Sequence, residues 1–436
     1  MTANHPKRPG SPAGVGPRAR RRLRCVARAS LFSVLWPSLV AAAAGPPLRF
    51  DLRNLNPDTT YSDHAGHGFD LGTRPGDDGR PFFYSVRVPE GNYRVTVTLG
   101  GAGAGDTTVK AESRRLMLEH VTTRPGERVT RSFLVNVRTP RLEPPPRNAP
   151  GGDAVRLNDR EQGVLHWDEK LTLEFNGPHP AVSSLAIEPA GDAITVFLAG
   201  DSTVTDQPKE PAASWGQMLP RFFGDTVAVA NHAESGETMK SFLTGLRLDK
   251  LLGQMKRGDY LFVQFGHNDS KAQWPQTYVE PFTTYKAYLK VFIAEARRRG
   301  ATPVLVTSPH RRVFDDQGRI KNTHGDYPAA VREVAAEEGV ALIDLHAMSA
   351  QFYEALGPEV APRAFNDDGR DATHHNNYGA YELARCVVKG IRAGVPELAA
   401  HLAADAGDPD PAKPDPVDTF TLPASPGRST VAPRGN

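Results

Sequence analysis

Residues 195–206 read TVFLAGDSTVTD, and this stretch decides the fold. Its first half, residues 195–199, is β-branched and apolar, which is typical of a buried strand. Gly200 and Asp201 then turn the chain, so that Ser202 arrives at the carboxyl end of that strand. Ligands bind at this edge in open α/β sheets, and a rigidly held serine there suits a nucleophile. Asp and Ser are also favoured in turns and helix caps, so a purely structural role stays open for this segment alone.

The segments that follow alternate between short apolar strands and longer helical patterns. We expect strands at residues 226–230, 260–265, 303–307 and 340–344, and helices at residues 283–299 and 328–338. This alternation predicts a mostly parallel sheet covered by helices on both faces. Residues 191–403 are therefore predicted to form a three-layer α/β domain.

The preceding part of the chain has a different character. Near-alternating segments at residues 82–88, 93–99, 107–111, 132–137 and 170–175 are separated by turn-forming residues, which predicts an all-β sandwich domain over residues 45–190. A Pro-rich loop interrupts it at residues 139–153. Residues 404–436 are rich in Pro, Asp and Ser, and we expect a disordered tail there.

Charge is distributed unevenly over the 436 residues. Residues 1–44 hold eight Lys and Arg side chains and no acidic one, followed by an apolar run at residues 29–40 and a small-residue stretch ending at Ala44. This is the pattern of a signal peptide, so we expect an exported protein, periplasmic or secreted. The pattern leaves Sec or twin-arginine export open, and an uncleaved membrane anchor is the structural alternative. The basic excess lies in this leader, and the remainder is acidic overall, which gives no support for nucleic-acid binding.

Cysteine content limits the sources of stability. The chain has two cysteines, Cys25 in the leader and Cys386 in an apolar helical pattern. After leader cleavage one cysteine would remain, so we expect no intrachain disulfide. No zinc-ligand spacing is present either.

Four segments at predicted strand ends carry the groups that acyl transfer needs. Ser202 belongs to the first, Gly236 to the second, and Asn268, with its amide donor, to the third. Asp371 precedes His374 by three residues in the fourth, and a carboxylate at that spacing can orient the imidazole toward a nucleophile.

These four blocks resemble those of the SGNH (GDSL-type) hydrolases. The sequences of residues 197–206, FLAGDSTVTD, and of residues 264–269, QFGHND, are most similar to the rhamnogalacturonan acetylesterase branch of this family. The resemblance covers about 200 residues and implies a flavodoxin-like sandwich with a five-stranded parallel sheet, no metal and no organic cofactor. It also implies roles for five residues: nucleophile (Ser202), general base and then acid (His374), its orienting carboxylate (Asp371), and an oxyanion hole built from the backbone N–H groups of Ser202 and Gly236 with the side chain of Asn268.

Two features of these blocks leave questions open. His375 stands beside His374, and we choose His374 because the family pattern places the imidazole three residues after the aspartate. Related esterases often have an arginine just after the second-block glycine, whereas this chain has Glu237. The charge around the substrate is therefore open.

Candidate substrate-binding residues follow the third and fourth predicted strands of the α/β domain. Trp274 offers an aromatic face to a sugar ring, and Arg311 and Arg312 offer cations to a galacturonate backbone. A solvated loop is the alternative for the two arginines. The sandwich resembles galactose-binding-like modules, although a spacer or a wall of the cleft fits equally well.

Together these features predict an exported serine esterase that removes O-acetyl groups from pectic rhamnogalacturonan through an acetyl-enzyme intermediate. The expected partner is an acetylated plant cell-wall polysaccharide or oligosaccharide. The alternatives are another SGNH specificity, such as an acetylxylan or a short-chain lipase-like esterase, and a polysaccharide-binding protein with a vestigial site.

Overall fold

The computed structural model describes residues 46–56, 58–76 and 79–429, which belong to one compact unit. The predicted leader, residues 1–44, lies outside the described residues. Within the described part of the chain, no helix is long and apolar enough to cross a membrane.

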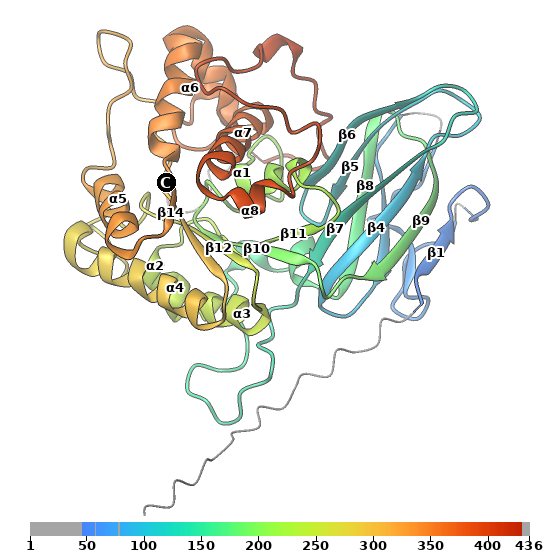
Figure 1. The fold of residues 1–436 in the computed structure, drawn as a ribbon. Helices are drawn as coiled ribbons and strands as arrows, with labels where there is room; N and C mark the ends of the chain where they lie inside the picture. The colour runs from blue at the N-terminus through green and yellow to red at the C-terminus, as the bar shows by residue number, and fades with distance from the viewer. Residues whose placement is uncertain (1–45, 57, 77–78, 430–436) are drawn as a thin grey trace, which may run out of the picture. The chain divides into compact units, whose positions relative to one another are not determined.

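The first half of the described chain is an all-β domain of two antiparallel sheets (Figure 1). One sheet has the strand order β1-β9-β4-β7 and the other β2-β3-β8-β5-β6. Their bounds are β1 (Leu48–Asp51), β2 (His67–Asp70), β3 (Phe82–Arg87), β4 (Gly91–Leu99), β5 (Gly105–Ala111), β6 (Arg115–Thr123), β7 (Val129–Val137), β8 (Lys170–His179) and β9 (Val182–Pro189). Alternate residues such as Val95 and Val97 of β4 and Leu171 and Leu173 of β8 form a shared core between the sheets. The five predicted strands of this half are confirmed.

The second half contains a parallel sheet with the order β11-β10-β12-β13-β14. Its strands are β10 (Ile194–Gly200), β11 (Val227–Asn231), β12 (Tyr260–Gln264), β13 (Thr302–Val306) and β14 (Ala341–Ile343). This is the flavodoxin-like order, as expected. The first strand, β10, has its two successors on either side, and the crevice at such a switch point is where ligands bind in open α/β sheets.

Helices cover both faces of the parallel sheet (Figure 1). They are α1 (Trp215–Met218), α2 (Met239–Thr244), α3 (Arg247–Gln254), α4 (Lys286–Arg298), α5 (Tyr327–Glu338), α6 (Leu345–Val360), α7 (Asn377–Gly394) and α8 (Pro396–Ala399). Side chains alternate across β10: Val196 and Leu198 join the core cluster formed with α1, α6 and α7. Phe197 and Ala199 join the cluster formed with α2, α3, α4 and α5. The strand is apolar on both faces because both are covered.

Buried ion pairs join the all-β domain to the α/β domain. Arg115 Nε of β6 lies 2.6 Å from Asp206 Oδ2, and both side chains are almost fully buried. Lys250 Nζ of α3 lies 2.7 Å from Glu90 Oε2, which precedes β4. Because Asp206 follows Ser202 by four residues, the all-β domain contacts the same loop that carries the serine.

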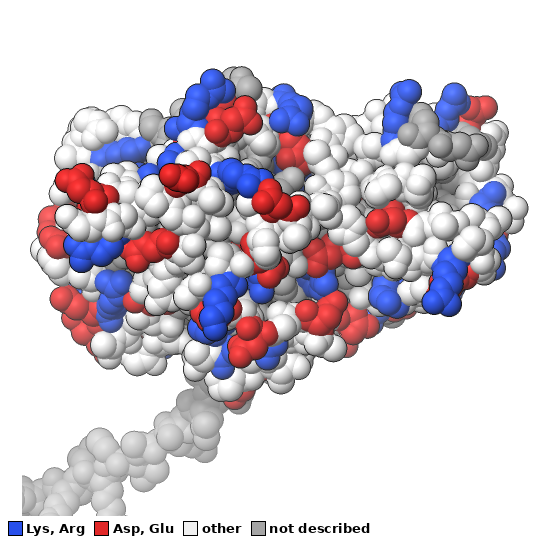
Figure 2. All heavy atoms as spheres, turned by 90° about the horizontal axis from the view of Figure 1, so that it is seen from above, with Lys and Arg blue, Asp and Glu red and all other residues white. Residues whose placement is uncertain are grey.

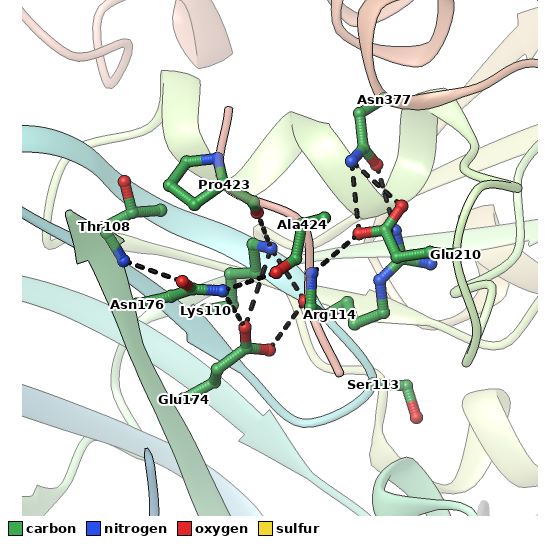
Figure 3. A network of polar contacts seen from close by, with 12 residues as sticks. Thr108, Lys110, Ser113, Arg114, Glu174, Asn176, Glu210, Asn377, Pro423 and Ala424 are labelled. Carbon is green, nitrogen blue, oxygen red and sulfur yellow. Dashed lines mark hydrogen bonds and ion pairs between the residues drawn. The ribbon is translucent and has the colours of Figure 1, made fainter. Parts of the chain in front are cut away.

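The C-terminal segment differs from the expected disordered tail. Over residues 404–429 it lies against both domains, and Figure 3 shows the contacts of Pro423 with Lys110 and of Ala424 with Asn176. Lys110 Nζ donates to Pro423 O at 2.6 Å and to Ser425 Oγ at 2.7 Å. Ser425 N donates to Glu210 Oε1 at 2.9 Å. The prediction of disorder is wrong for these residues because buried polar groups, which composition does not reveal, hold the segment in place.

Charges of both signs are interspersed over the face drawn in Figure 2. This face therefore lacks the continuous basic surface that is typical of nucleic-acid binding.

Candidate active site

Ser202 lies in a tight turn directly after β10. The backbone carbonyl of Asp201 accepts hydrogen bonds from Val204 N and Thr205 N, which closes the turn. A Cβ at Gly200 would lie 2.6 Å from the Val204 side chain and 2.9 Å from a backbone oxygen of β12, so this close packing requires a glycine. The chain therefore folds back on itself and holds Ser202 at the sheet edge.

Two side chains anchor the backbone of Ser202. Its carbonyl oxygen accepts from Gln207 Nε2 and from Ser214 Oγ, each at 2.9 Å. Both donors are buried. The serine is thus fixed through its main chain, which leaves its hydroxyl for another partner.

That partner is His374, which completes a chain of three side chains. Ser202 Oγ lies 2.8 Å from His374 Nε2, and His374 Nδ1 lies 2.8 Å from Asp371 Oδ2. Burial acts to raise the pKa of Asp371, but hydrogen bonds from His374 and from the backbone of Thr373 outweigh it and hold the pKa well below its usual range. The ionised carboxylate can only accept, so Nδ1 carries the proton and Nε2 is left to accept from the Ser202 hydroxyl.

The side chain of His375 points away from these three hydrogen-bonded side chains. Its Nε2 bonds to Tyr353 Oη at 2.7 Å, and burial lowers its pKa to about 3. Its backbone carbonyl accepts from Ala213 N. The geometry thus separates the two adjacent histidines, with His374 directed at Ser202 and His375 packed in the core.

Arg312 supports the loop that carries Asp371. Its backbone N–H donates to Ala372 O at 2.7 Å, and its guanidinium donates to Gly369 O and lies over the Phe365 ring. These contacts hold the loop from both sides of the aspartate. The predicted substrate contact of Arg312 stays a prediction.

Three donors predicted for an oxyanion hole come from three neighbouring segments. Gly236 has φ = +83°, a conformation that favours glycine. Among the described residues, no acceptor takes the backbone N–H of Ser202 or Gly236. Asn268 Nδ2 donates to Glu237 O at 3.1 Å, which places its amide beside Gly236.

The loop around Asn268 is held by its neighbours Asp269 and His267. Asp269 accepts from Met239 N and from Gly266 N, each at 3.0 Å. Burial raises the pKa of Asp269 to about 7, although these backbone donors oppose the shift. His267 Nδ1 lies 3.0 Å from His324 Nε2.

The charge of Glu237 is balanced by Arg247 of α3, which lies ten residues further along the chain. Glu237 Oε1 lies 3.3 Å from Arg247 Nε, and its Oε2 accepts from Ser241 Oγ at 2.6 Å. Arg247 also pairs with the buried Glu161 of the all-β domain. A cation is therefore present behind the second block, supplied by α3.

Lys271 is a site residue that the sequence reading missed. Its Nζ donates to Asn268 Oδ1 at 3.3 Å and lies 4.6 Å from the centroid of the Trp274 ring. Burial lowers its pKa, and the nearby Arg311 lowers it further. Its position three residues after Asn268, in a turn, is the signal that could have found it. Trp274 is thereby linked to the oxyanion segment through one side chain.

Arg311 lies beside the same segment. It donates to His267 O at 3.3 Å and to Thr323. Its half-buried guanidinium and the ammonium of Lys271 form no salt bridge with a described carboxylate. Two cations are thus available next to Asn268.

The arrangement can perform nucleophilic acyl transfer. A serine with its hydroxyl on an oriented imidazole, next to convergent N–H donors, is the geometry of that chemistry on many folds. Two separate clusters could hold a metal ion among the described residues: His310 with His324 and His346, and Glu161 with His166 and Glu234. Neither includes Ser202, His374 or Asp371.

Comparison with known proteins places this geometry in a family. Residues 197–380 match the GDSL-like lipase/acylhydrolase family. The rhamnogalacturonan acetylesterase RhgT of Bacillus subtilis is 42% identical over 228 residues, which cover 49% of this chain and 96% of that protein. The chain belongs to the GDSL-like lipase/acylhydrolase family. It is a carboxylic ester hydrolase with an SGNH α/β domain, and an all-β domain precedes that domain.

Two further relatives of this GDSL-like hydrolase extend the comparison. The rhamnogalacturonan acetylesterase of Emericella nidulans is 25% identical over 232 residues, which cover 48% of this chain and 90% of that protein. The crystal structure of YxiM from Bacillus subtilis is 24% identical, covers 80% of this chain and 98% of that chain, and has a TM-score of 0.47.

Proposed function

We propose that this hydrolase is an exported carbohydrate esterase that removes O-acetyl groups from pectic rhamnogalacturonan. The hydrogen-bonded chain from Ser202 through His374 to Asp371, with both links at 2.8 Å, carries the proposal. The identity of 42% over nearly the whole length of a rhamnogalacturonan acetylesterase supports the substrate class.

The first half of the reaction forms an acetyl-enzyme. His374 Nε2 takes the Ser202 proton as Oγ attacks the acetyl carbonyl carbon, and the resulting imidazolium faces the carboxylate of Asp371. The N–H groups of Ser202 and Gly236, with Asn268 Nδ2, stabilise the oxyanion. His374 then gives its proton to the departing sugar oxygen.

The second half releases acetate. Water takes the place of the sugar alcohol, and His374 removes a proton from it as it attacks the acetyl-serine. Collapse of the second tetrahedral intermediate breaks the bond to Ser202 Oγ, which recovers its proton from His374. Each proton in the cycle thus moves between Ser202, His374, the sugar oxygen and water.

Charge near the site favours an acidic sugar backbone. Arg311 and Lys271, which lack carboxylate partners among the described residues, suit the carboxylates of galacturonate. Trp274 adds an aromatic face beside Lys271, where a sugar ring can stack. A pectic substrate satisfies both features at once.

Export and domain organisation belong to the same proposal. We assign residues 1–44 to a cleaved leader, residues 45–190 to the accompanying all-β domain and residues 191–403 to the catalytic domain. A plant cell-wall substrate lies outside the producing cell, which agrees with a leader.

The decisive experiment measures acetate release from acetylated rhamnogalacturonan, acetylated xylan and a small aryl acetate. We compare the parent with Ser202→Ala, and with Ser62→Ala as a matched control on an exposed serine. We expect rapid release from the first polymer, lost in Ser202→Ala and kept in Ser62→Ala. Faster release from acetylated xylan would overturn the proposed substrate class. Equal activity of Ser202→Ala and the parent would overturn the proposed role of Ser202 as the nucleophile.

A further inference from the structure

A cluster of buried histidines lies beside the catalytic site and takes no part in the proposed reaction. His310 follows β13, His324 precedes α5, and His346 lies in the first turn of α6. Each offers a ring nitrogen, and these three atoms all lie within 4.8 Å of one another. The rings of His310 and His346 are stacked with centroids 3.5 Å apart.

The free nitrogens of this cluster are those that a metal ion would use. Within the described residues, Nδ1 of His310 and Nδ1 of His324 are buried and have no hydrogen-bond partner. A buried polar atom without a partner is costly, and each such atom needs an explanation. Nδ1 of His346 instead bonds to Ser308 O at 3.0 Å, which leaves its Nε2 to face the other two rings.

The outer contacts match those of metal-bound histidines. A ligating imidazole usually donates its second N–H to a carbonyl, a carboxylate or another acceptor. Ser308 O provides this acceptor for His346, and His267 Nδ1, at 3.0 Å from His324 Nε2, provides it for His324. Two of the three rings are thus oriented by such a contact.

The protonation states agree with this geometry. Burial lowers the pKa of His310 to about 4 and of His346 to about 4, and it lowers the pKa of His324 well below the usual value. The rings are therefore neutral at pH 7, which is the form that binds a metal ion. Asp344, two residues before His346, lies nearby and is paired with Arg332, whose Nε donates to its Oδ2 at 2.9 Å.

We propose that His310, His324 and His346 form a binding site for Zn²⁺. Three imidazole nitrogens are a common zinc ligand set, with the fourth position left for water. Zn–N bonds of about 2.0–2.1 Å in a tetrahedron place the nitrogens roughly 3.4 Å apart. The stacked rings of His310 and His346 must therefore turn out of their stack for both nitrogens to bind one ion. The ion joins the loop that carries Arg311 to α6, and through His267 it steadies the segment that carries Asn268.

The second cluster is unsuitable by comparison. Glu161 and Glu234 pair with Arg247 and Arg160, so cations already balance both carboxylates. His166 Nδ1 bonds to Ser113 Oγ at 2.7 Å. The histidine cluster contains no ion-paired carboxylate, and Arg311 and Arg332 lie near its rings.

The test measures Zn²⁺ binding directly. The purified protein is treated with a chelator, dialysed and titrated with Zn²⁺ by calorimetry at neutral pH. We expect about one ion per chain. His324→Gln and His346→Ala should each weaken Zn²⁺ binding by about 100-fold or more, because loss of a hydrogen-bond partner of a metal ligand already costs up to about 100-fold in affinity. His64→Gln, on an exposed histidine of the all-β domain, should bind like the parent.

A second measurement keeps the test valid if a variant does not fold. X-ray absorption at the zinc edge of the loaded parent should show imidazole nitrogens at about 2.0–2.1 Å. Added Zn²⁺ should also raise the unfolding midpoint of the parent and of His64→Gln, because an ion that binds only the folded state stabilises it. A parent that binds no Zn²⁺, or folded variants that bind it as tightly as the parent, would overturn the proposal.

Discussion

At the scale of single residues, Asn268 carries the clearest expectation. Its Nδ2 is the one side-chain donor of the proposed oxyanion hole, and Lys271 fixes the amide by bonding to Oδ1. We expect Asn268→Ala to lower turnover by about 10²–10³-fold, the usual loss for one such donor, with little change in the unfolding midpoint. Acetate release and thermal unfolding check this, with Asn54→Ala, on an exposed asparagine, as the control. An unchanged turnover in folded protein would remove Asn268 from the site.

Asp371 carries a prediction about pH. Its pKa is lower in the folded protein than the value of about 3.9 in an unfolded chain, so the folded state binds fewer protons between these values. Its contribution to stability is therefore complete above about pH 4 and is lost as the pH falls through the folded pKa. We expect the unfolding midpoints of the parent and Asp371→Asn to converge as the pH is lowered below about 4.

Activity gives a second measure of the same substitution. Replacing a triad carboxylate by an amide typically costs about 10⁴ in turnover, because the imidazole loses the orientation that it needs. Asp408→Asn, on an exposed aspartate of the C-terminal segment, should change neither the pH dependence of the unfolding midpoint below about pH 4 nor the turnover. Midpoints of Asp371→Asn and the parent that stay equally separated at every pH would contradict the linkage argument.

At the scale of elements, the C-terminal segment is held by Ser425. Its Oγ accepts from Lys110 and donates to Glu174 at 2.8 Å, and all three side chains are buried. Ser425→Ala leaves a buried ammonium and a buried carboxylate short of a partner, which should lower the free energy of unfolding by about 1–3 kcal/mol. Denaturant unfolding measures this, and Thr419→Ala, at an exposed site in the same segment, should have a much smaller effect. Equal effects of the two would mean that this contact does not hold the segment.

At the scale of the whole molecule, the two domains depend on buried charge pairs. Arg115 and Asp206 are 2% and 0% exposed, so removing the cation leaves an unbalanced buried carboxylate near the serine loop. We expect Arg115→Leu to lower the free energy of unfolding by about 3–5 kcal/mol. Arg94 also pairs across the two domains, with Asp225, but these side chains are 33% and 50% exposed and 3.8 Å apart, so Arg94→Leu should have a much smaller effect. Comparable losses in the two variants would show that burial of the pair is not what matters.

Much of the site could be predicted because its signals are local. The apolar run before Gly200, the turn at Asp201 and the spacing of three between Asp371 and His374 act through neighbouring residues, and the strand–helix alternation determines which strand ends share an edge. The separation of His374 from His375 needed a family pattern as well. The structure adds a reason, since His375 lies against Tyr353 in the core.

What the sequence by itself determined is the order of the five parallel strands, two of the helices between them and the blocks that follow the strands, because periodicity and turn chemistry are properties of adjacent residues. Tertiary structure alone decided the packing of residues 404–429, the pairing of Glu237 with Arg247, and the meeting of His310, His324 and His346. These contacts join polar side chains that lie on different loops, strands and helices, and no local pattern records which of them meet. These polar side chains meet only when the assembled domains bury them together.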